Sequence, residues 1–282
     1  MSNRDYSVPA VEKALDILFF LKNSEHAQST LTEIASGLGL NKSSCLMILR
    51  TLQARNLIRV DENSRKYSLG LGFLELAAVV TDQVSHISLA KPVIERLAQE
   101  THLTLFTAKR VAQDTVMILD KAEFREIAYV SFPIGQRRPI TAGATGKVYL
   151  AFMDEAERES ILAETGPVQY TPATITDHER LAREICQVRT SGYSVNFGEY
   201  TIGINGVAAP VFDQQANVAT TITAVGFPQA LHAGNIHSIG QRISAAACQL
   251  TLLLQGRFPE SLTRPAKYSL SSDQFIEGAV QS

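Results

Sequence analysis

The chain has 282 residues, of which 45% are apolar, enough for a substantial core and for more than one domain. Its three cysteines, Cys45, Cys186 and Cys248, are far apart and show no CxxC spacing, which argues against a disulfide framework or a zinc ribbon and fits a reducing cytoplasm. No segment has about 18 uncharged apolar residues, and the N-terminus lacks the apolar core of a signal peptide, so we expect no membrane segment.

The net charge of −2 is unevenly distributed along the chain. Residues 1–70 contain 9 Lys and Arg against 7 Asp and Glu, whereas the remainder contains 17 against 21. This balance permits nucleic-acid binding by the N-terminal part. It does not establish such binding, because many solvated surfaces carry a similar excess.

The N-terminal region begins with two predicted helices. An apolar stripe at helical spacing predicts a scaffold helix over residues 8–22, packed by that stripe. Thr30 and Glu33 then form the S/T-x-x-E pattern of a capping box, which predicts a short second helix ending at Gly37 or Gly39. The stripe consists of Val11, Ala14, Leu15, Leu18 and Leu21.

A third helix follows the glycine-containing turn at residues 37–40. Asn41 is a good N-cap for a helix through about Ala54, which closes a helix-turn-helix. One face, with Cys45, Ile48, Leu49 and Leu52, is expected to pack inward, and the opposite face to meet DNA. The predicted DNA-binding residues of this helix are Lys42, Ser43, Ser44, Leu46, Met47 and Arg50.

Two short segments, at residues 57–60 and 66–69, flank a turn at residues 61–64 and predict a two-stranded wing. Arg65 and Lys66 lie beside that turn and, with Lys42, are placed to contact phosphates. Each of these charges alone is more simply a solvated side chain. A small helical domain for protein contacts is the alternative, but the combination of capped helix, glycine turn, second helix and basic wing favours DNA binding.

The segment that follows is too apolar for an exposed single helix. It requires a partner, which is either a second copy or the rest of its own chain. Its apolar residues are Leu71, Phe73, Leu74, Leu76, Ala77, Val79 and Val80.

From about residue 86 the pattern mixes helices and strands, which predicts an α+β domain. The residues from 257 to 282, with Pro259, Pro265 and many serines, are expected to form a flexible tail. We expect strands at 103–110, 115–121, 127–132, 193–196, 206–212 and 218–226, and helices at 88–100, 144–152, 155–164, 177–191 and 233–254.

Several segments resemble the IclR family of bacterial transcription regulators, namely VEKALDILFFL, LTEIASGLGLNKSSCLMILRTLQARNLI, RKYSLGLGFLELA and GYSVNFGEYTIGINGVAAPVFD. The resemblance implies a DNA-binding domain at 1–70, a linker helix at 71–85 that helps pair two such domains, and a GAF-like effector domain at 86–256. It also implies a homodimer or dimer of dimers on double-stranded operator DNA, in the bacterial cytoplasm with the nucleoid. Repression is the family's commonest behaviour, although the sequence itself leaves activation open.

The third helix and its N-cap differ from the family's usual residues at three positions. Family members often carry proline where Asn41 stands and a polar or basic residue near Leu46 and Met47. Apolar side chains there leave fewer hydrogen-bonding groups for bases and favour contact with thymine methyl groups. We therefore expect an operator that departs from the family's usual pattern.

The segment from Thr141 to Lys147 is the predicted pocket element, because its small residues open a helix whose free amides can hold a carboxylate. A nucleotide-binding P-loop does not fit, since position 141 is Thr instead of Gly and Val148 follows Lys147 in place of Ser or Thr. Close helix packing is the alternative reason for these small residues.

The resemblance implies a small effector, a carboxylate or aromatic acid, held by the positions that correspond to Ala144, Thr145, Asn196 and Gly206. Family members often have Asp where Asn196 stands, and some have Cys where Gly206 stands. Loss of the acid removes a charge that repels anions, and glycine adds room, so we expect a larger or differently polar ligand.

No cofactor, metal or catalytic group is expected. The six histidines include no HxxxH pair, and there is no GxSxG elbow or recognisable cysteine nucleophile motif. A hydrolase is therefore a weak alternative. An architectural DNA binder without a ligand is another, but it would not need about 170 residues of mixed structure.

Overall fold

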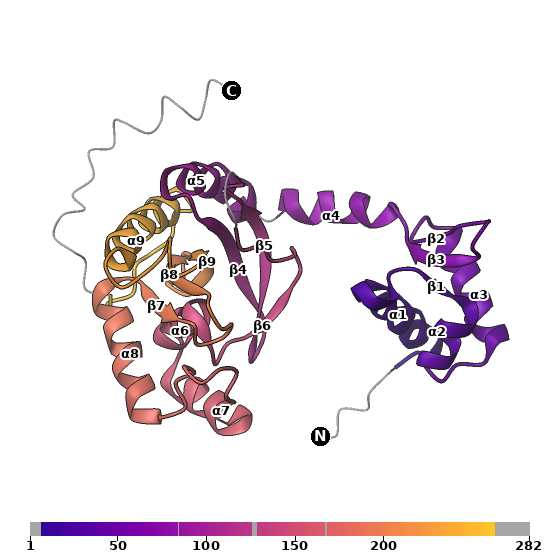
Figure 1. Cartoon of the computed structure of the whole chain (residues 1–282), viewed down its shortest axis with the longest axis horizontal. Helices are drawn as coiled ribbons and strands as arrows, with labels where there is room; N and C mark the ends of the chain where they lie inside the picture. Colours follow the sequence, from indigo (N-terminus) through magenta and orange to yellow (C-terminus); the bar gives the residue numbers. More distant parts are fainter. Residues whose placement is uncertain (1–6, 84, 126–128, 167, 263–282) are drawn as a thin grey trace. The chain divides into compact units, whose positions relative to one another are not determined.

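The computed structural model describes residues 7–83, 85–125, 129–166 and 168–262. The chain divides into two compact units, Met1–Gln83 and Val84–Ser282 (Figure 1). No helix in the described ranges is long and apolar enough to cross a membrane. The predicted tail lies mostly outside the described residues, which end at residue 262.

The first unit contains a helix-turn-helix and a small antiparallel sheet in the order β1-β3-β2, with β1 before α2 and the other two strands after α3. The capping box is confirmed, because Thr30 Oγ1 accepts from the Glu33 amide and the Glu33 carboxylate accepts from the Thr30 amide. The elements are α1 (Pro9–Lys22), η1 (Ser24–His26), β1 (Ser29–Thr30), α2 (Leu31–Gly37), α3 (Lys42–Gln53), β2 (Ile58–Val60), β3 (Lys66–Leu69) and α4 (Gly72–Gln83).

The predicted packing stripe of α1 is wrong in part. Ile17 and Leu21 enter the core of this unit, whereas Val11 and Leu15 are 54% and 48% exposed. Helical spacing shows that apolar residues share a face, but α1 carries two apolar faces and only one meets this unit's core. The short strand β1, which pairs with β3 beside the wing, was not predicted.

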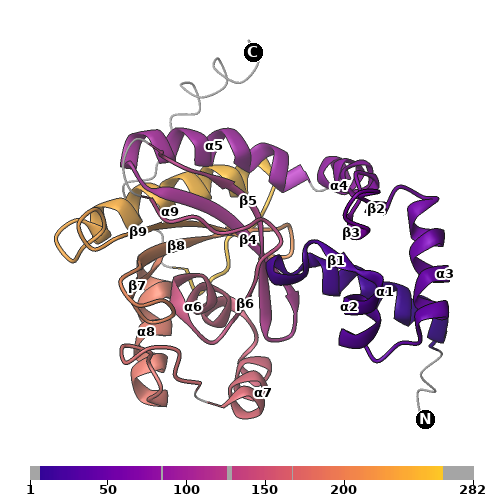
Figure 2. The ribbon, with the colours of Figure 1, turned by 45° about the vertical axis from the view of Figure 1, so that its right-hand side comes forward.

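The second unit is a six-stranded antiparallel sheet in the order β6-β5-β4-β9-β8-β7, and the α+β prediction is confirmed. Helices α5 and α9 cover one face, while α6 and α8 pack on the other (Figures 1 and 2). The elements are α5 (Ser85–Thr101), β4 (Thr104–Ala112), β5 (Thr115–Ala122), β6 (Arg137–Pro139), α6 (Gly143–Phe152), α7 (Glu155–Thr165), α8 (His178–Ser191), β7 (Ser194–Phe197), β8 (Asn205–Phe212), β9 (Val218–Gly226) and α9 (Ile236–Leu253).

The strand predicted at 127–132 is wrong over its described part, residues 129–132, and residues 127–128 lie outside the described ranges. Val130 is buried against the sheet, but its carbonyl accepts a hydrogen bond from the Thr104 hydroxyl. A buried backbone carbonyl in an apolar segment can therefore be hydrogen-bonded by a side chain, without the segment pairing as a strand of the sheet. The edge position beside β5 is taken by β6.

Candidate functional site

The helix-turn-helix presents α3 with one face buried and one face free. Asn41 caps the helix, as predicted, because its Oδ1 accepts from the Ser44 amide at 2.7 Å. Cys45 and Leu49 are buried, and Met47 is 70% exposed. The inward and outward faces of α3 therefore match the amphipathic pattern of its sequence.

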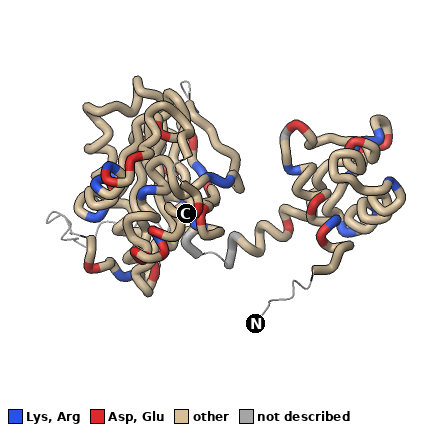
Figure 3. Tube along the Cα trace, turned by 90° about the horizontal axis from the view of Figure 1, so that it is seen from below, with Lys and Arg blue, Asp and Glu red and all other residues tan. Residues whose placement is uncertain are grey.

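The predicted DNA-binding residues differ in their accessibility. Lys42, Ser43, Met47, Arg50 and Arg65 are exposed. The half-buried members are Ser44, Leu46 and Lys66. Hydrogen bonds from Thr30 lower the pKa of Glu33, and the positive charge of Lys66 lowers it further. Figure 3 shows basic and acidic residues mixed along the described trace of this unit, so in that view charge alone does not mark a DNA surface.

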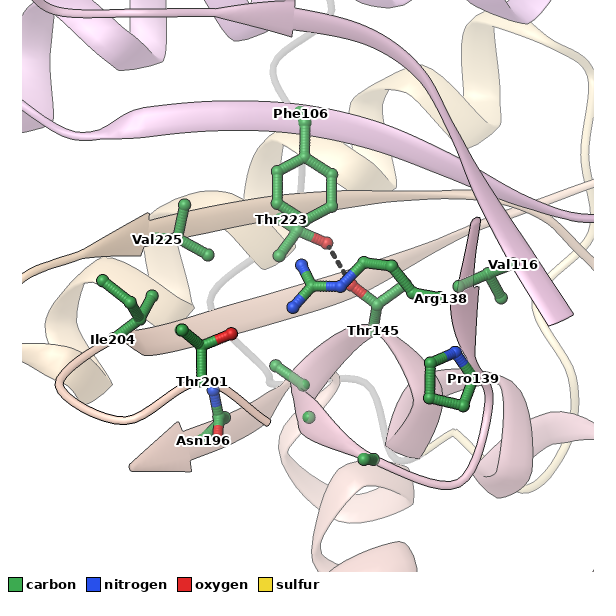
Figure 4. A pocket seen from close by; sticks show the side chains of 14 residues that line it. Phe106, Val116, Arg138, Pro139, Thr145, Asn196, Thr201, Ile204, Thr223 and Val225 are labelled. Carbon is green, nitrogen blue, oxygen red and sulfur yellow. Dashed lines mark hydrogen bonds between the residues drawn. The ribbon is translucent and has the colours of Figure 1, made fainter. Parts of the chain in front are cut away.

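The four predicted effector residues lie together at one cavity in the second unit. Ala144 and Thr145 come from the first turn of α6, Asn196 from β7, and Gly206 from the paired position on β8. All four are buried. Segments far apart in the sequence are thus brought to the same cavity wall (Figure 4).

The polar groups of this cavity are arranged in pairs. Thr145 Oγ1 and Thr223 Oγ1 lie 3.0 Å apart. Asn196 Oδ1 accepts from the Glu199 amide at 2.8 Å, and the Asn196 side-chain nitrogen lies 3.5 Å from the position that a Cβ on Gly206 would take. The amide orientation leaves a donor group beside Gly206, which an aspartate would not supply.

Sequence reasoning missed most of the cavity's other lining residues. The apolar walls are formed by Phe106, Val116, Ile204 and Val225, and Arg138 and Thr201 add polar groups. Alternation along β4 and β9 turns Phe106, Thr223 and Val225 toward the cavity, which a correct pairing of the two strands would have revealed. The free space is about 20 Å³, room for little more than a water molecule.

The glycines of the predicted pocket segment have two different roles. Gly143 has φ +75°, a left-handed conformation that other residues rarely adopt. A Cβ on Gly146 would lie 2.0 Å from the Ile140 carbonyl oxygen, so this glycine permits close approach of α6 to the preceding chain. Close packing therefore explains Gly146, and turn geometry explains Gly143.

Lys147 is buried in the second turn of α6 and is only 1% exposed. Its ammonium group lies 2.8 Å from Glu199 Oε1 and 3.0 Å from Glu184 Oε2. Burial raises the pKa of Glu199, and the positive charge of Lys147 opposes that rise. Because two carboxylates already surround it, this lysine does not serve as a phosphate-binding P-loop lysine.

Arg138 is the cation that lines the cavity itself. Its guanidinium carbon lies 4.3 Å from the Tyr200 ring centroid and 4.7 Å from the Phe132 ring centroid. Burial lowers the pKa of Arg138, an effect that Tyr200 opposes. Arginine nevertheless stays protonated at neutral pH, so the cavity contains a permanent positive charge. In the described parts of the chain, no group of three or more His, Cys, Asp or Glu side chains is positioned to hold a metal ion.

The fold and site together define a winged helix-turn-helix transcription regulator with a separate ligand-binding domain. The family model described as the IclR helix-turn-helix domain matches residues 10–62, and the model described as the bacterial transcriptional regulator IclR C-terminal domain matches residues 78–252. The chain therefore belongs to the IclR family of bacterial transcription regulators. Proteins of this family are regulators and not enzymes.

Individual relatives support the same assignment. The HTH-type transcriptional repressor AllR of Escherichia coli K12 is 28% identical over 245 residues, 87% of this chain and 90% of its own length. An IclR transcriptional regulator from Alicyclobacillus acidocaldarius is 33% identical with a TM-score of 0.80, covering 88% of this chain and 100% of that one. An IclR homologue from Microbacterium hydrocarbonoxydans, solved with 4-hydroxybenzoate, shares the fold at 21% identity and a TM-score of 0.77, covering 87% and 99%.

Replacing Lys147 with methionine should lower the free energy of unfolding by about 3–5 kcal/mol at neutral pH, because it leaves Glu199 buried without its cation. The deficit should shrink as the pH is lowered. Without Lys147 the pKa of Glu199 in the folded protein lies further above its value in the unfolded protein. As the pH falls, the folded state therefore binds a proton at Glu199 before the unfolded state does, and the variant gains stability; as the pH rises, it loses that stability. Urea unfolding over a pH series measures both effects.

The double variant Lys147→Met with Glu199→Gln is the matched control, because it removes both buried charges. It should recover most of the lost stability. Equal loss in the single and double variants would contradict the importance of charge pairing at this position.

Proposed function

We propose that the protein is a repressor that binds operator DNA through its N-terminal unit and changes its operator affinity when an organic acid occupies the cavity of the C-terminal unit. The observation that carries this proposal is the convergence of four predicted effector residues, from separate segments, on one buried cavity in an IclR-family chain. The repressor name of the E. coli relative supports repression. Such a regulator acts on the nucleoid in the cytoplasm.

We assign residues 1–70 to DNA binding, 71–85 to the linker and 86–256 to effector binding. In this assignment Ser43, Leu46, Met47 and Arg50 read bases, with Ser44 beside them on the helix. Lys42, Arg65 and Lys66 contact phosphates. The exposure of Met47 and Arg50 on α3 supports the groove-facing assignment.

The effector is proposed to be a small carboxylate or aromatic acid held by Ala144, Thr145, Asn196 and Gly206. The Microbacterium homologue, which was solved with 4-hydroxybenzoate, supports an aromatic acid as one candidate. The apolar walls of the cavity and its hydroxyl pair suit a ligand with an apolar body and a few polar atoms.

The active form is proposed to be a homodimer or a dimer of dimers, because the first unit leaves large apolar side chains uncovered. On α1 these are Val8 near its start, Val11, Leu15 and Phe19, and Leu74 on α4 is 66% exposed. Large apolar side chains that recur at helical spacing on an exposed face are typical of an association site. A dimer also fits a two-fold operator read in adjacent major-groove turns. The other exposed apolar residues at α4 are Leu71, Leu76, Val79 and Val80.

Replacing Arg50 with alanine should weaken operator binding by about 1–3 kcal/mol, because it removes a groove-facing cation. Fluorescence anisotropy with the promoter region beside the protein's own gene measures this change. Lys42→Ala should weaken binding to all sequences alike and reduce the salt dependence by about one counterion. The control is Arg183→Ala, an exposed arginine on α8, and unchanged affinity of Arg50→Ala at low salt would refute the groove-facing assignment.

Replacing Leu74 with glutamate should reduce self-association and operator affinity together, because it puts a charge on the apolar surface of α4. Sedimentation velocity on the full chain measures the assembly. Glu75→Gln alters the next residue of the same helix without changing its apolar face and should leave the assembly intact. A Leu74→Glu protein that sediments like the parent would argue against pairing through α4.

Replacing Asn196 with leucine, or Thr145 with methionine, should abolish the effector response and leave ligand-free operator binding intact. The first change removes a donor from the cavity, and the second fills space that is already small. Operator titration with a panel of carboxylic and aromatic acids measures the response, with the exposed Gln215→Leu as control. If both variants respond like the parent, the pocket assignment is wrong.

A further inference from the structure

Arg138 extends from an edge strand into the effector cavity. Strand β6 contains two adjacent arginines, and alternation along the strand leaves Arg137 exposed while Arg138 lines the cavity. Figure 4 shows the Arg138 side chain lying across the cavity, which Phe106, Thr201 and Thr223 also line. The position of the cation is therefore fixed by the register of β6 with β5.

No carboxylate of the described residues forms an ion pair with Arg138. Its guanidinium contacts are the rings of Phe132 and Tyr200, at 4.7 and 4.3 Å. By contrast, two other cations of this unit have acidic partners: Lys147 has Glu199 at 2.8 Å and Arg110 has Glu157 at 2.7 Å. The aromatic contacts and a side-chain hydrogen bond with Tyr200 offset part of the cost of desolvating this guanidinium. A guanidinium has five N–H donors, so donors remain that can pair with an anion.

Among the described residues that line the cavity, none carries a negative charge. Its polar side chains besides Arg138 are Thr145, Asn196, Thr201 and Thr223, and all of them are neutral. The acidic Glu199 is close in sequence but directs its carboxylate to Lys147. An occupant with one negative charge would therefore complete the electrostatic pairing of this cavity, and a neutral occupant would not.

We propose that Arg138 selects the charge of the effector, so that the cavity takes a compact monocarboxylate whose carboxylate pairs with the guanidinium. The apolar part of the ligand then packs against Phe106, Ile204 and Val225. Because the free space is about 20 Å³, the long Arg138 side chain must shift to admit such a ligand. This inference rests on the proposed effector role of the cavity and adds the residue that recognises charge.

Isothermal titration calorimetry of the full chain tests the inference with matched acid and amide probes. The acids are acetate, benzoate and 4-hydroxybenzoate, and the neutral partners are acetamide, benzamide and 4-hydroxybenzamide. At least one acid should bind, about 10-fold or more tightly than its amide. Arg138→Met should weaken that acid about 10- to 100-fold, the effect of one charge-assisted hydrogen-bonding pair.

Two variants make the result specific to Arg138. Arg138→Lys keeps the charge without the bidentate fork and should lose less affinity than Arg138→Met. Arg137→Met removes the exposed neighbouring charge on β6 and should bind the acid like the parent. Since methionine is as long and flexible as the arginine stem, a folded Arg138→Met protein is expected, and its thermal unfolding checks this.

The outcomes separate this inference from the proposed function. If Arg138→Met binds acids like the parent, or amides bind as well as acids, Arg138 does not select charge, while a retained effect of any probe on operator affinity leaves the regulatory function standing. If only the neutral probes change operator affinity, Arg138 again does not select charge, and the regulatory function stands. If no probe binds even at millimolar concentration, the charge-selection inference fails, and an unaltered operator affinity then weighs against the effector role as well.

Discussion

The region around the cavity depends on one buried positive charge, that of Lys147. A lysine ammonium that is almost completely removed from water costs several kcal/mol unless acidic partners surround it. Glu199 and Glu184 supply those partners from the segment after β7 and from α8. The charge therefore fixes three separate parts of the second unit against one another, and two of them, α6 and the segment after β7, contribute to the cavity wall.

The segment after β7 is held at its backbone as well as through Glu199. Thr174 donates to the Glu199 carbonyl at 2.6 Å, and Thr171 donates to the Gly198 carbonyl at 2.7 Å. Asn196 accepts from the Glu199 amide. Tyr200 and Thr201 follow directly, so the ring that contacts Arg138 and a hydroxyl of the cavity wall are positioned by the same network. These short hydrogen bonds therefore fix one part of the cavity wall.

Local signals in the sequence predicted what is determined locally. The capping residues Thr30 and Asn41 located the starts of α2 and α3, since a cap is a contact between residues three apart. Periodicity located α1 but did not distinguish its core-facing residue Ile17 from the exposed Leu15, because that depends on which surface meets the rest of the unit. The prediction that Ala144 and Asn196 line the same cavity came from the family resemblance and not from their spacing in the sequence.

The position of Arg138 in the cavity could not be predicted from the sequence. In the sequence it is one of two adjacent arginines in a short strand, and such residues are ordinarily solvated. Its role depends on strand register and on a ring from the distant segment that contains Tyr200, and neither has a local signature. The same limit applies to Thr223, which is identified only when β9 is paired with β4.

The size of the proposed charge recognition matches what regulation requires. A ligand changes operator affinity only to the extent that it binds one arrangement of the protein better than another, and couplings of about 1–3 kcal/mol are typical. A hydrogen bond to a charged group contributes about 1.5–3 kcal/mol. If the ligand carboxylate pairs with Arg138 in one conformation of the protein and with water in the other, the two binding free energies therefore differ by the required amount.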